Sequence, residues 1–218
     1  MKTIKNSYRQ DIIKLIEGDN LVGIELGVAG GEFSKRMVES GRFSQFYGVD
    51  MYADMHDTDE YKMALKHVGI DKNYKLFRMT FEEALDLFED NSLDFIYVDG
   101  YAHSGEEGGR TIIDWSKKVK IGGLIAGDDY HKDWPLVVQA VDSFVESING
   151  DLYVTENVEK GPTSEFPSWG VIKRQQCNLE YDQTLVEKGI SENKKHEMQY
   201  LKQIVKKKLM PSFLKKRR

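Results

Sequence analysis

Three aspartates at the ends of two apolar runs are the side chains in this sequence best suited to hold a metal ion. Asp99 ends the predicted strand 93–99, and Asp128 and Asp129 are adjacent near the end of the predicted strand 124–131. At neighbouring strand ends their carboxylates would repel one another, and their pKa values would rise. A divalent cation such as Mg²⁺ would remove that repulsion. The alternative is that Asp128 or Asp129 caps the next helix while the other faces solvent.

A turn of small residues between a strand and a helix is typical of a nucleotide site. Residues 22–26 predict a buried strand, and a helix is expected to start at Glu32. Glycines let the backbone approach a ligand closely, and a helix start offers free N–H groups. A dinucleotide-binding turn is disfavoured, because Glu32 stands where G-x-G-x-x-G/A needs a small residue. The residues that alternate here are instead Glu25, Gly27, Ala29 and Gly31.

A further carboxylate ends the predicted strand 46–51. Asp50 lies nineteen residues after Gly31, close to the interval at which an acidic residue binds ribose hydroxyls. We therefore expect Asp50, with its neighbour Met51, to contact a nucleoside. The alternative is an aspartate that stabilises a turn or caps a helix.

The pattern E-x-G-x-A-x-G at residues 25–31 resembles motif I of the class I S-adenosylmethionine (SAM) methyltransferases. Asp99-Gly100, Asp114-Trp115 and the segments 122–130 and 140–144 are similar to the macrocin-type sugar O-methyltransferases, a methyltransferase-24-like family. This resemblance implies an α/β, Rossmann-like fold. Its seven-stranded, mostly parallel sheet would have the order 3-2-1-4-5-7-6, with helices on both faces.

The same resemblance assigns roles to individual residues. It implies that Asp99, Asp128 and Asp129 bind Mg²⁺ and that His103 is the catalytic base, with His131 in reserve. His103 lies four residues after Asp99, whereas three are usual in the family. The loop after the third strand borders the adenine in these enzymes. The implied cofactor-binding residues are Glu25, Gly27, Ala29, Gly31, Asp50, Met51, Thr80, Phe81 and Asp99.

These parts predict a Mg²⁺-assisted transfer of a methyl group from SAM to a hydroxyl. The metal would lower the pKa of the acceptor oxygen, and the histidine would take its proton. The acceptor is expected to be a small molecule, a sugar or sugar-bearing metabolite by resemblance alone. Three alternatives stay open: metal-independent O- or N-methylation with the acidic pair serving the acceptor directly, an NAD-linked oxidoreductase, and a non-catalytic SAM-binding protein.

The elements that must position these residues follow from the apolar pattern. An amphipathic helix is expected over 3–17 and a polar helix over 183–209, and the last two strands are expected to form an antiparallel hairpin. We divide the chain into an N-terminal helix (1–20), a methyltransferase domain (21–175) and a polar helical C-terminal extension with a basic tail (176–218). The predicted strands are 22–26, 46–51, 74–79, 93–99, 124–131, 152–155 and 169–173.

Composition narrows the class of protein. The 218 residues, 40% hydrophobic and 31% charged, are enough for one domain with a sizeable core. No apolar run reaches the roughly 20 residues of a membrane span, and the start lacks the apolar segment of a secretory signal. The single cysteine, Cys177, excludes an intrachain disulfide framework and fits a reducing compartment. A cytoplasmic enzyme is therefore expected.

The charge is distributed unevenly. Residues 202–218 contain eight lysines and arginines and no acid. The net charge of the whole chain is −5, so the remaining residues carry a net charge of −13. An acidic body argues against a nucleic-acid partner. The basic tail is expected either to be solvated or to touch an anionic membrane surface weakly, a phosphorylated acceptor or a partner subunit. The polar C-terminal helix is a candidate homodimer interface.

Overall fold

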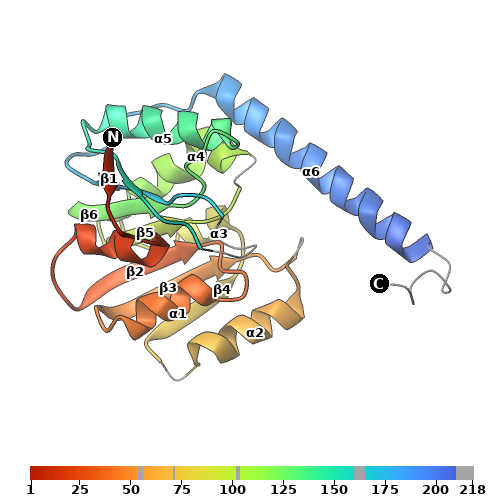
Figure 1. Cartoon of the computed structure of the whole chain (residues 1–218), viewed down its shortest axis with the longest axis horizontal. Coiled ribbons are helices and arrows are strands. Elements are labelled where there is room, and N and C mark those ends of the chain that lie inside the picture. The colour runs from red at the N-terminus through yellow and green to blue at the C-terminus, as the bar shows by residue number, and fades with distance from the viewer. Residues whose placement is uncertain (54–55, 71, 102–103, 160–164, 210–218) are drawn as a thin grey trace.

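A single eight-stranded sheet forms the centre of the protein, with helices on both faces (Figure 1). The computed structural model describes residues 1–53, 56–70, 72–101, 104–159 and 165–209. The strands are β1 (Lys2–Ile4), β2 (Leu21–Leu26), β3 (Phe43–Asp50), β4 (Tyr74–Arg78), β5 (Leu93–Val98), β6 (Val119–Gly127), β7 (Tyr153–Thr155) and β8 (Trp169–Ile172).

The order of the strands is β4-β3-β2-β5-β6-β8-β7-β1. Strands β2 to β8 correspond to the seven predicted strands and follow the predicted order 3-2-1-4-5-7-6. The prediction of seven strands was one short, because β1 adds an eighth at the edge and pairs in parallel with β7. Strand β8 is antiparallel to both of its neighbours, and the other described pairs are parallel.

The expected N-terminal amphipathic helix is absent from the described structure and is replaced by two short elements. Residues 2–4 form β1, and η1 (Arg9–Leu15) is a 3₁₀-helix. The apolar residues that suggested a helix, Ile12 and Ile16, are buried as expected. The preceding residues instead satisfy the open edge of β7, since Lys2 donates to Leu152 and Ile4 accepts from Glu156. A helix at 2–4 would leave that edge unpaired.

Two apolar layers cover the sheet. On one face α1 (Glu32–Glu39), α2 (Thr58–Val68) and η1 enclose an aromatic cluster that includes Phe33, Phe46, Phe95 and Tyr97. On the other face α3 (Phe81–Leu85), α4 (Gly105–Ser116) and α5 (Pro135–Ser147) bury an aliphatic core around Trp115. Strands covered on both faces need continuous apolar runs, which is why the sequence located them well.

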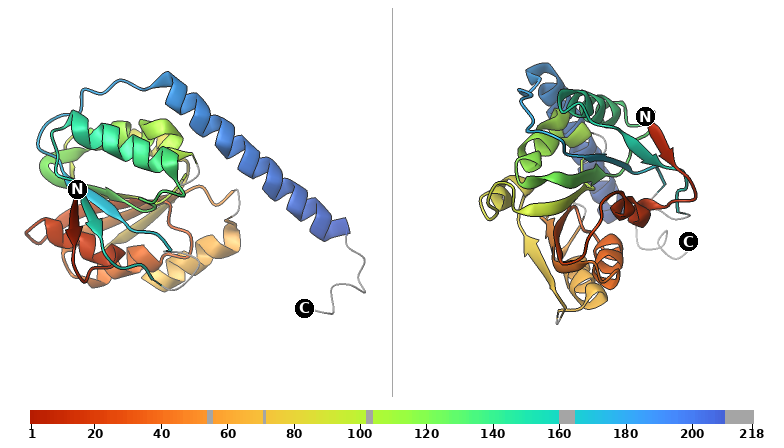
Figure 2. Two further views of the ribbon diagram at one scale, coloured as in Figure 1. Left: turned by 45° about the horizontal axis from the view of Figure 1, so that its top comes forward. Right: turned by 90° about the vertical axis from the view of Figure 1, so that its left-hand side faces the viewer.

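The long helix α6 (Gln183–Leu209) leaves the body of the protein (Figure 2). Its bounds agree with the predicted polar helix at 183–209. Leu185 and Val186 in its first turn are buried, whereas Met198, Leu201 and Val205 are more than half exposed. Among the described residues, no helix has the length and apolarity needed to cross a membrane. The predicted dimer and membrane contacts of this extension are untested, and residues 210–218 lie outside the described part.

Candidate functional site

The turn between β2 and α1 is pressed against the end of β5. Gly27 has a φ of +93°, and a Cβ atom there would lie 1.8 Å from the carbonyl oxygen of Asp99. Ala29 and Gly31 also have positive φ values, of +47° and +83°. Only glycine fits at position 27, because a side chain would displace the backbone of the neighbouring strand end. The predicted small-residue turn is therefore present and tightly packed.

Asp50 holds this turn in place. Its Oδ2 accepts hydrogen bonds from the backbone N–H groups of Val28 and Ala29, at 2.9 and 3.0 Å. Its Oδ1 accepts a third from the N–H of Tyr52, at 3.0 Å. This is the turn-stabilising role weighed as the alternative for Asp50, and ribose binding stays a prediction. Met51, which follows, is partly exposed at the same edge.

Two further buried side chains form hydrogen bonds at or beside the turn. Tyr52, which the sequence analysis missed, is almost fully buried and donates its hydroxyl to the carbonyl of Ala29 at 2.8 Å. Glu25 is buried and accepts a hydrogen bond from the hydroxyl of Ser34. Burial raises the pKa of Glu25 to about 8, although Arg9 opposes the shift. Glu25 therefore connects the end of β2 to α1, and its predicted role at the cofactor stays a prediction.

Arg9, from η1, is the cation of this site, and the sequence analysis missed it. Its Nη2 lies 2.6 Å from Asp99 Oδ2, and its Nη1 lies 3.6 Å from Asp128 Oδ2. Nη2 is also 3.9 Å from Glu25 Oε1, and the side chain is only 7% exposed. The guanidinium also contacts the rings of Phe33 and Tyr97, whose centroids lie 4.9 and 5.2 Å from its Cζ. No local pattern separates Arg9 from other arginines, since its partners are distant in the sequence.

The predicted magnesium ligands do not fit a resident ion in this arrangement. Asp128 Oδ1 accepts from the hydroxyl of Ser168 at 3.0 Å, and its Oδ2 faces Arg9. Asp99 Oδ2 also bonds to Arg9, so a divalent cation here would meet a guanidinium of like charge. The described residues contain no group of three or more His, Cys, Asp or Glu side chains placed to hold a metal. The expected repulsion is real, but an arginine offsets it.

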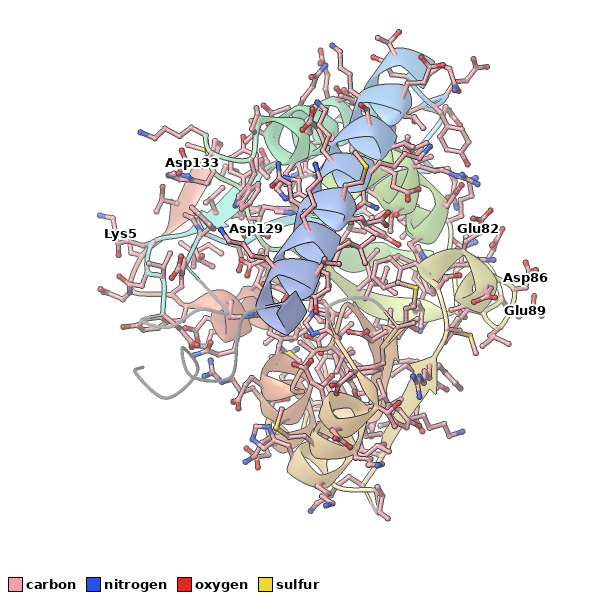
Figure 3. The ribbon with its side chains drawn as sticks, turned by 90° about the vertical axis from the view of Figure 1, so that its right-hand side faces the viewer. Lys5, Glu82, Asp86, Glu89, Asp129 and Asp133 are labelled. Atoms are coloured by element: carbon pink, nitrogen blue, oxygen red, sulfur yellow. The ribbon has the colours of Figure 1, made fainter. Side chains whose placement is uncertain are left out.

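Asp129, which is labelled in Figure 3, forms no ion pair with Arg9, unlike Asp99 and Asp128. Burial, together with the nearby Asp128 and Asp99, raises its pKa to about 8. Burial and Asp99 likewise raise the pKa of Asp128 to about 7. No side chain in the described ranges donates a hydrogen bond to the Asp129 carboxylate. It is therefore the carboxyl group most available to a ligand at the ends of β5 and β6.

Of the two predicted catalytic histidines the structure describes His131, whose side chain contacts residues other than the three aspartates. His131 packs its ring 4.9 Å from that of Phe166, and its Nδ1 lies 3.4 Å from the exposed Asp133. None of the contacts described for its ring involves the three aspartates. His103 lies outside the described residues. A catalytic role for either histidine stays a prediction.

Thr80 and Phe81, the two residues predicted to border the adenine, have different surroundings in the loop after β4. Thr80 caps α3: its hydroxyl accepts from the N–H of Glu83 at 3.2 Å, and the Glu83 carboxylate accepts from the N–H of Thr80 at 2.9 Å. The ring of Phe81 packs edge-on against Tyr101, with centroids 5.3 Å apart, and lies over Gly100 at the end of β5. Phe81 therefore packs on the end of β5, beside the point where Gly27 also packs, whereas the side chain of Thr80 is committed to its cap.

Known proteins match both the sequence and this arrangement. Residues 24–130 match a family model described as a methyltransferase domain. The chain contains a methyltransferase domain. This match supports the predicted resemblance to the class I enzymes, while the macrocin-type subgroup stays a prediction. The match includes the turn, Asp50, Asp99 and the Asp128–Asp129 pair.

Solved structures of methyltransferases share the fold at low sequence identity. An O-methyltransferase from Bacillus cereus in complex with S-adenosylhomocysteine (SAH) has 12% identity and a TM-score of 0.55, covering 75% of this chain and 77% of its own. A SAM-dependent O-methyltransferase from Thermotoga maritima has 14% identity and a TM-score of 0.56, with 81% and 69% covered. The N-methyltransferase NodS from Bradyrhizobium japonicum has 15% identity and a TM-score of 0.55, with 76% and 93% covered. No curated protein matches significantly.

Proposed function

We propose that this methyltransferase transfers the methyl group of SAM to a hydroxyl oxygen of a small acceptor held over the ends of β5 and β6. The observation that carries the proposal is the position of Asp129, an unengaged carboxyl near the cofactor turn. The O-methyltransferases among the structural neighbours support the choice of oxygen. A sugar or sugar-bearing metabolite is the acceptor that the sequence resemblance favours.

The residues of the chain have separate tasks in this reaction. SAM supplies a methyl group on a sulfonium, which an oxygen displaces in line. The backbone of Gly27 to Gly31 forms the cofactor cradle, and Asp50 keeps that cradle rigid through its three backbone hydrogen bonds. Rigid placement contributes much of the rate, because the reacting atoms must meet at about 3 Å.

Asp129 accepts the proton of the acceptor hydroxyl in this scheme. Its pKa of about 8 makes it a stronger base than an ordinary aspartate, and a base works best when its pKa is near the working pH. We infer the metal-independent form of the reaction rather than the Mg²⁺-assisted one. Arg9 supports this choice, since it already bonds to Asp99 and faces Asp128.

The test compares Asp129→Asn with Asp133→Asn, an exposed aspartate four residues away. Calorimetry with SAH measures cofactor binding, and SAH release with a panel of hydroxylated sugars measures transfer. We expect Asp129→Asn to lower kcat about 10²- to 10⁴-fold, with the SAH Kd within about twofold of wild type, and Asp133→Asn to change neither. Wild-type kcat/KM should rise with pH and level off above about 8, since the base acts deprotonated. Absence of SAH binding by the wild type would refute the proposal.

The metal question has its own test. Protein dialysed against EDTA should retain its activity, and added Mg²⁺ should change it less than about twofold. A loss on EDTA treatment that Mg²⁺ restores at least tenfold would overturn the metal-independent form. Asp128→Asn in the same assay would then show whether this aspartate binds the metal.

A further inference from the structure

Glu106 is a buried acid with no role in the reaction proposed above. It lies in a strained turn at the start of α4. Residues 105–109 all have positive φ values, from +50° to +89°. Two of them, Glu106 and Glu107, are not glycine, and each costs roughly 1–2 kcal/mol in this conformation. Strain of this kind persists where the surroundings enforce it, and it is common at binding sites.

Backbone from two other helices enforces the turn. A Cβ on Gly105 would lie 2.4 Å from the carbonyl carbon of Leu136 in α5, and one on Gly108 would lie 2.4 Å from the nitrogen of Val186 in α6. On the α6 side, a Cβ on Gly189 would lie 2.5 Å from the carbonyl oxygen of Ser104. The conformation of the turn is therefore fixed by close backbone packing.

The turn places Glu106 inside the protein without a partner. The residue is only 4% exposed, and its Oε2 has no hydrogen-bond partner among the described residues. Burial, together with the nearby Asp129 and Asp99, raises its pKa well above the ordinary value. The nearby Asp99 side chain is 25% exposed, so solvent reaches that member of the acidic group. A strained backbone that buries an unpaired acid beside two others does not contribute to stability.

The missing partner of this acid is a cation. Arg9 is engaged by Glu25, Asp99 and Asp128. Within the described part of the chain, no lysine, arginine or histidine forms an ion pair with Glu106 or Asp129. A protonated amine carries both a positive charge and N–H donors, and its charge would favour the ionised form of both carboxyl groups.

We propose that the acceptor carries a protonated amine beside the hydroxyl that is methylated, and that Glu106 binds this ammonium while Asp129 faces the hydroxyl. This inference rests on the proposed O-methyl transfer and adds the class of its substrate, an amino alcohol or amino sugar. The two groups are neighbours in a 1,2-amino alcohol, and Asp129 is the carboxylate whose charge most affects the pKa of Glu106. The ammonium group is not methylated, because it has no lone pair to attack with.

Matched probes test the proposal directly. SAH-loaded protein is titrated by calorimetry with D-glucosamine against D-glucose, and with 2-aminoethanol against ethylene glycol. We expect at least one amine to bind at least tenfold more tightly than its neutral partner. Glu106→Gln should remove that preference while leaving the SAH Kd within about twofold. Glu107→Gln, the same change one residue along the turn, should preserve the preference.

Two outcomes would overturn the inference. In the first, neither wild-type amine binds more tightly than its neutral partner, a comparison that needs no variant to fold. In the second, Glu106→Gln weakens binding of SAM but not of SAH, which would mean that Glu106 serves the sulfonium instead of the acceptor. Failure of the proposed function looks different, because the wild type would then not bind SAH at all.

Discussion

The carboxyl groups on the two sides of the proposed site differ in their hydrogen bonding. The cofactor side is the turn with Asp50 and Glu25, and the acceptor side is Asp129 with Glu106. On the cofactor side Asp50 accepts three backbone hydrogen bonds, and Glu25 accepts one from Ser34. On the acceptor side, the described structure gives the carboxyl groups of Glu106 and Asp129 no donor. The first half has its hydrogen bonds satisfied without a ligand, which suits the proposed binding of one fixed cofactor. The second half lacks donors, and in our proposal the acceptor supplies the missing positive charge.

Arg9 lies between the two halves, so replacing it should have the largest effect. Arg9→Met leaves Glu25, Asp99 and Asp128 without their buried cation, and breaking a buried ion pair costs about 3–5 kcal/mol. Urea unfolding measures the loss. Arg110→Met, which removes the exposed pair with Glu82, should cost less than about 1 kcal/mol. Equal effects of the two variants would mean that Arg9 does not offset the acidic cluster.

The next largest effect should come from the close packing of Gly27 against the backbone of Asp99. Gly27→Ala would place a Cβ 1.8 Å from the backbone oxygen of Asp99, so the turn must move. We expect a loss of at least about 2 kcal/mol in stability or in SAH affinity. Gly41→Ala is the matched control, because Gly41 also has a positive φ but has open space around it. If the Gly27→Ala variant is as stable and binds SAH as tightly as the control, the close packing of the turn does not matter for cofactor binding.

A smaller effect should follow from weakening the carboxylate that holds the turn. Asp50→Asn keeps the shape but replaces one acceptor oxygen by a donor, which faces either Tyr52 N–H or the Val28 and Ala29 N–H groups. Leaving such a group unsatisfied costs about 1–3 kcal/mol. Weaker SAH binding in calorimetry, by about tenfold or more, is expected. Unchanged affinity would show that the cradle does not depend on this charge.

The smallest effect separates a structural cap from a cofactor contact. Thr80→Ala removes the cap of α3 and should cost about 1 kcal/mol in thermal unfolding. The SAH Kd should stay within about twofold, because the Thr80 hydroxyl is already committed to Glu83. A large loss of SAH affinity without a loss of stability would mean that Thr80 contacts the cofactor.

The sequence was most informative where chemistry and local pattern coincide. Apolar runs located the seven core strands, and the spacing of Glu25, Gly27, Ala29 and Gly31 identified the turn. Both depend on residues close in the sequence, so a single chain reveals them. The capping box at Thr80 and the long helix at 183–209 were recognised for the same reason.

What sequence reasoning missed depends on distant contacts. The partner of Arg9 is Asp99, ninety positions away, and no local pattern reveals such a pair. The same limitation applies to the acidic cluster, because the repulsion between its carboxylates is visible in the sequence and the arginine that faces them is not. Residues 2–4 became a strand for an equally distant reason, the open edge of β7. The left-handed turn around Glu106 depends on packing against α5 and α6.

Strand β1 also determines when the site is completed during synthesis. Its partner strand β7 comprises residues 153–155, so β1 has no place in the sheet until most of the chain has been made. At roughly 5–20 residues per second, that delay is on the order of ten to thirty seconds. Arg9 follows β1 closely, so the carboxylates at the centre of the sheet acquire their cation late. A chain interrupted before β7 would contain the cofactor turn without the charge balance around it.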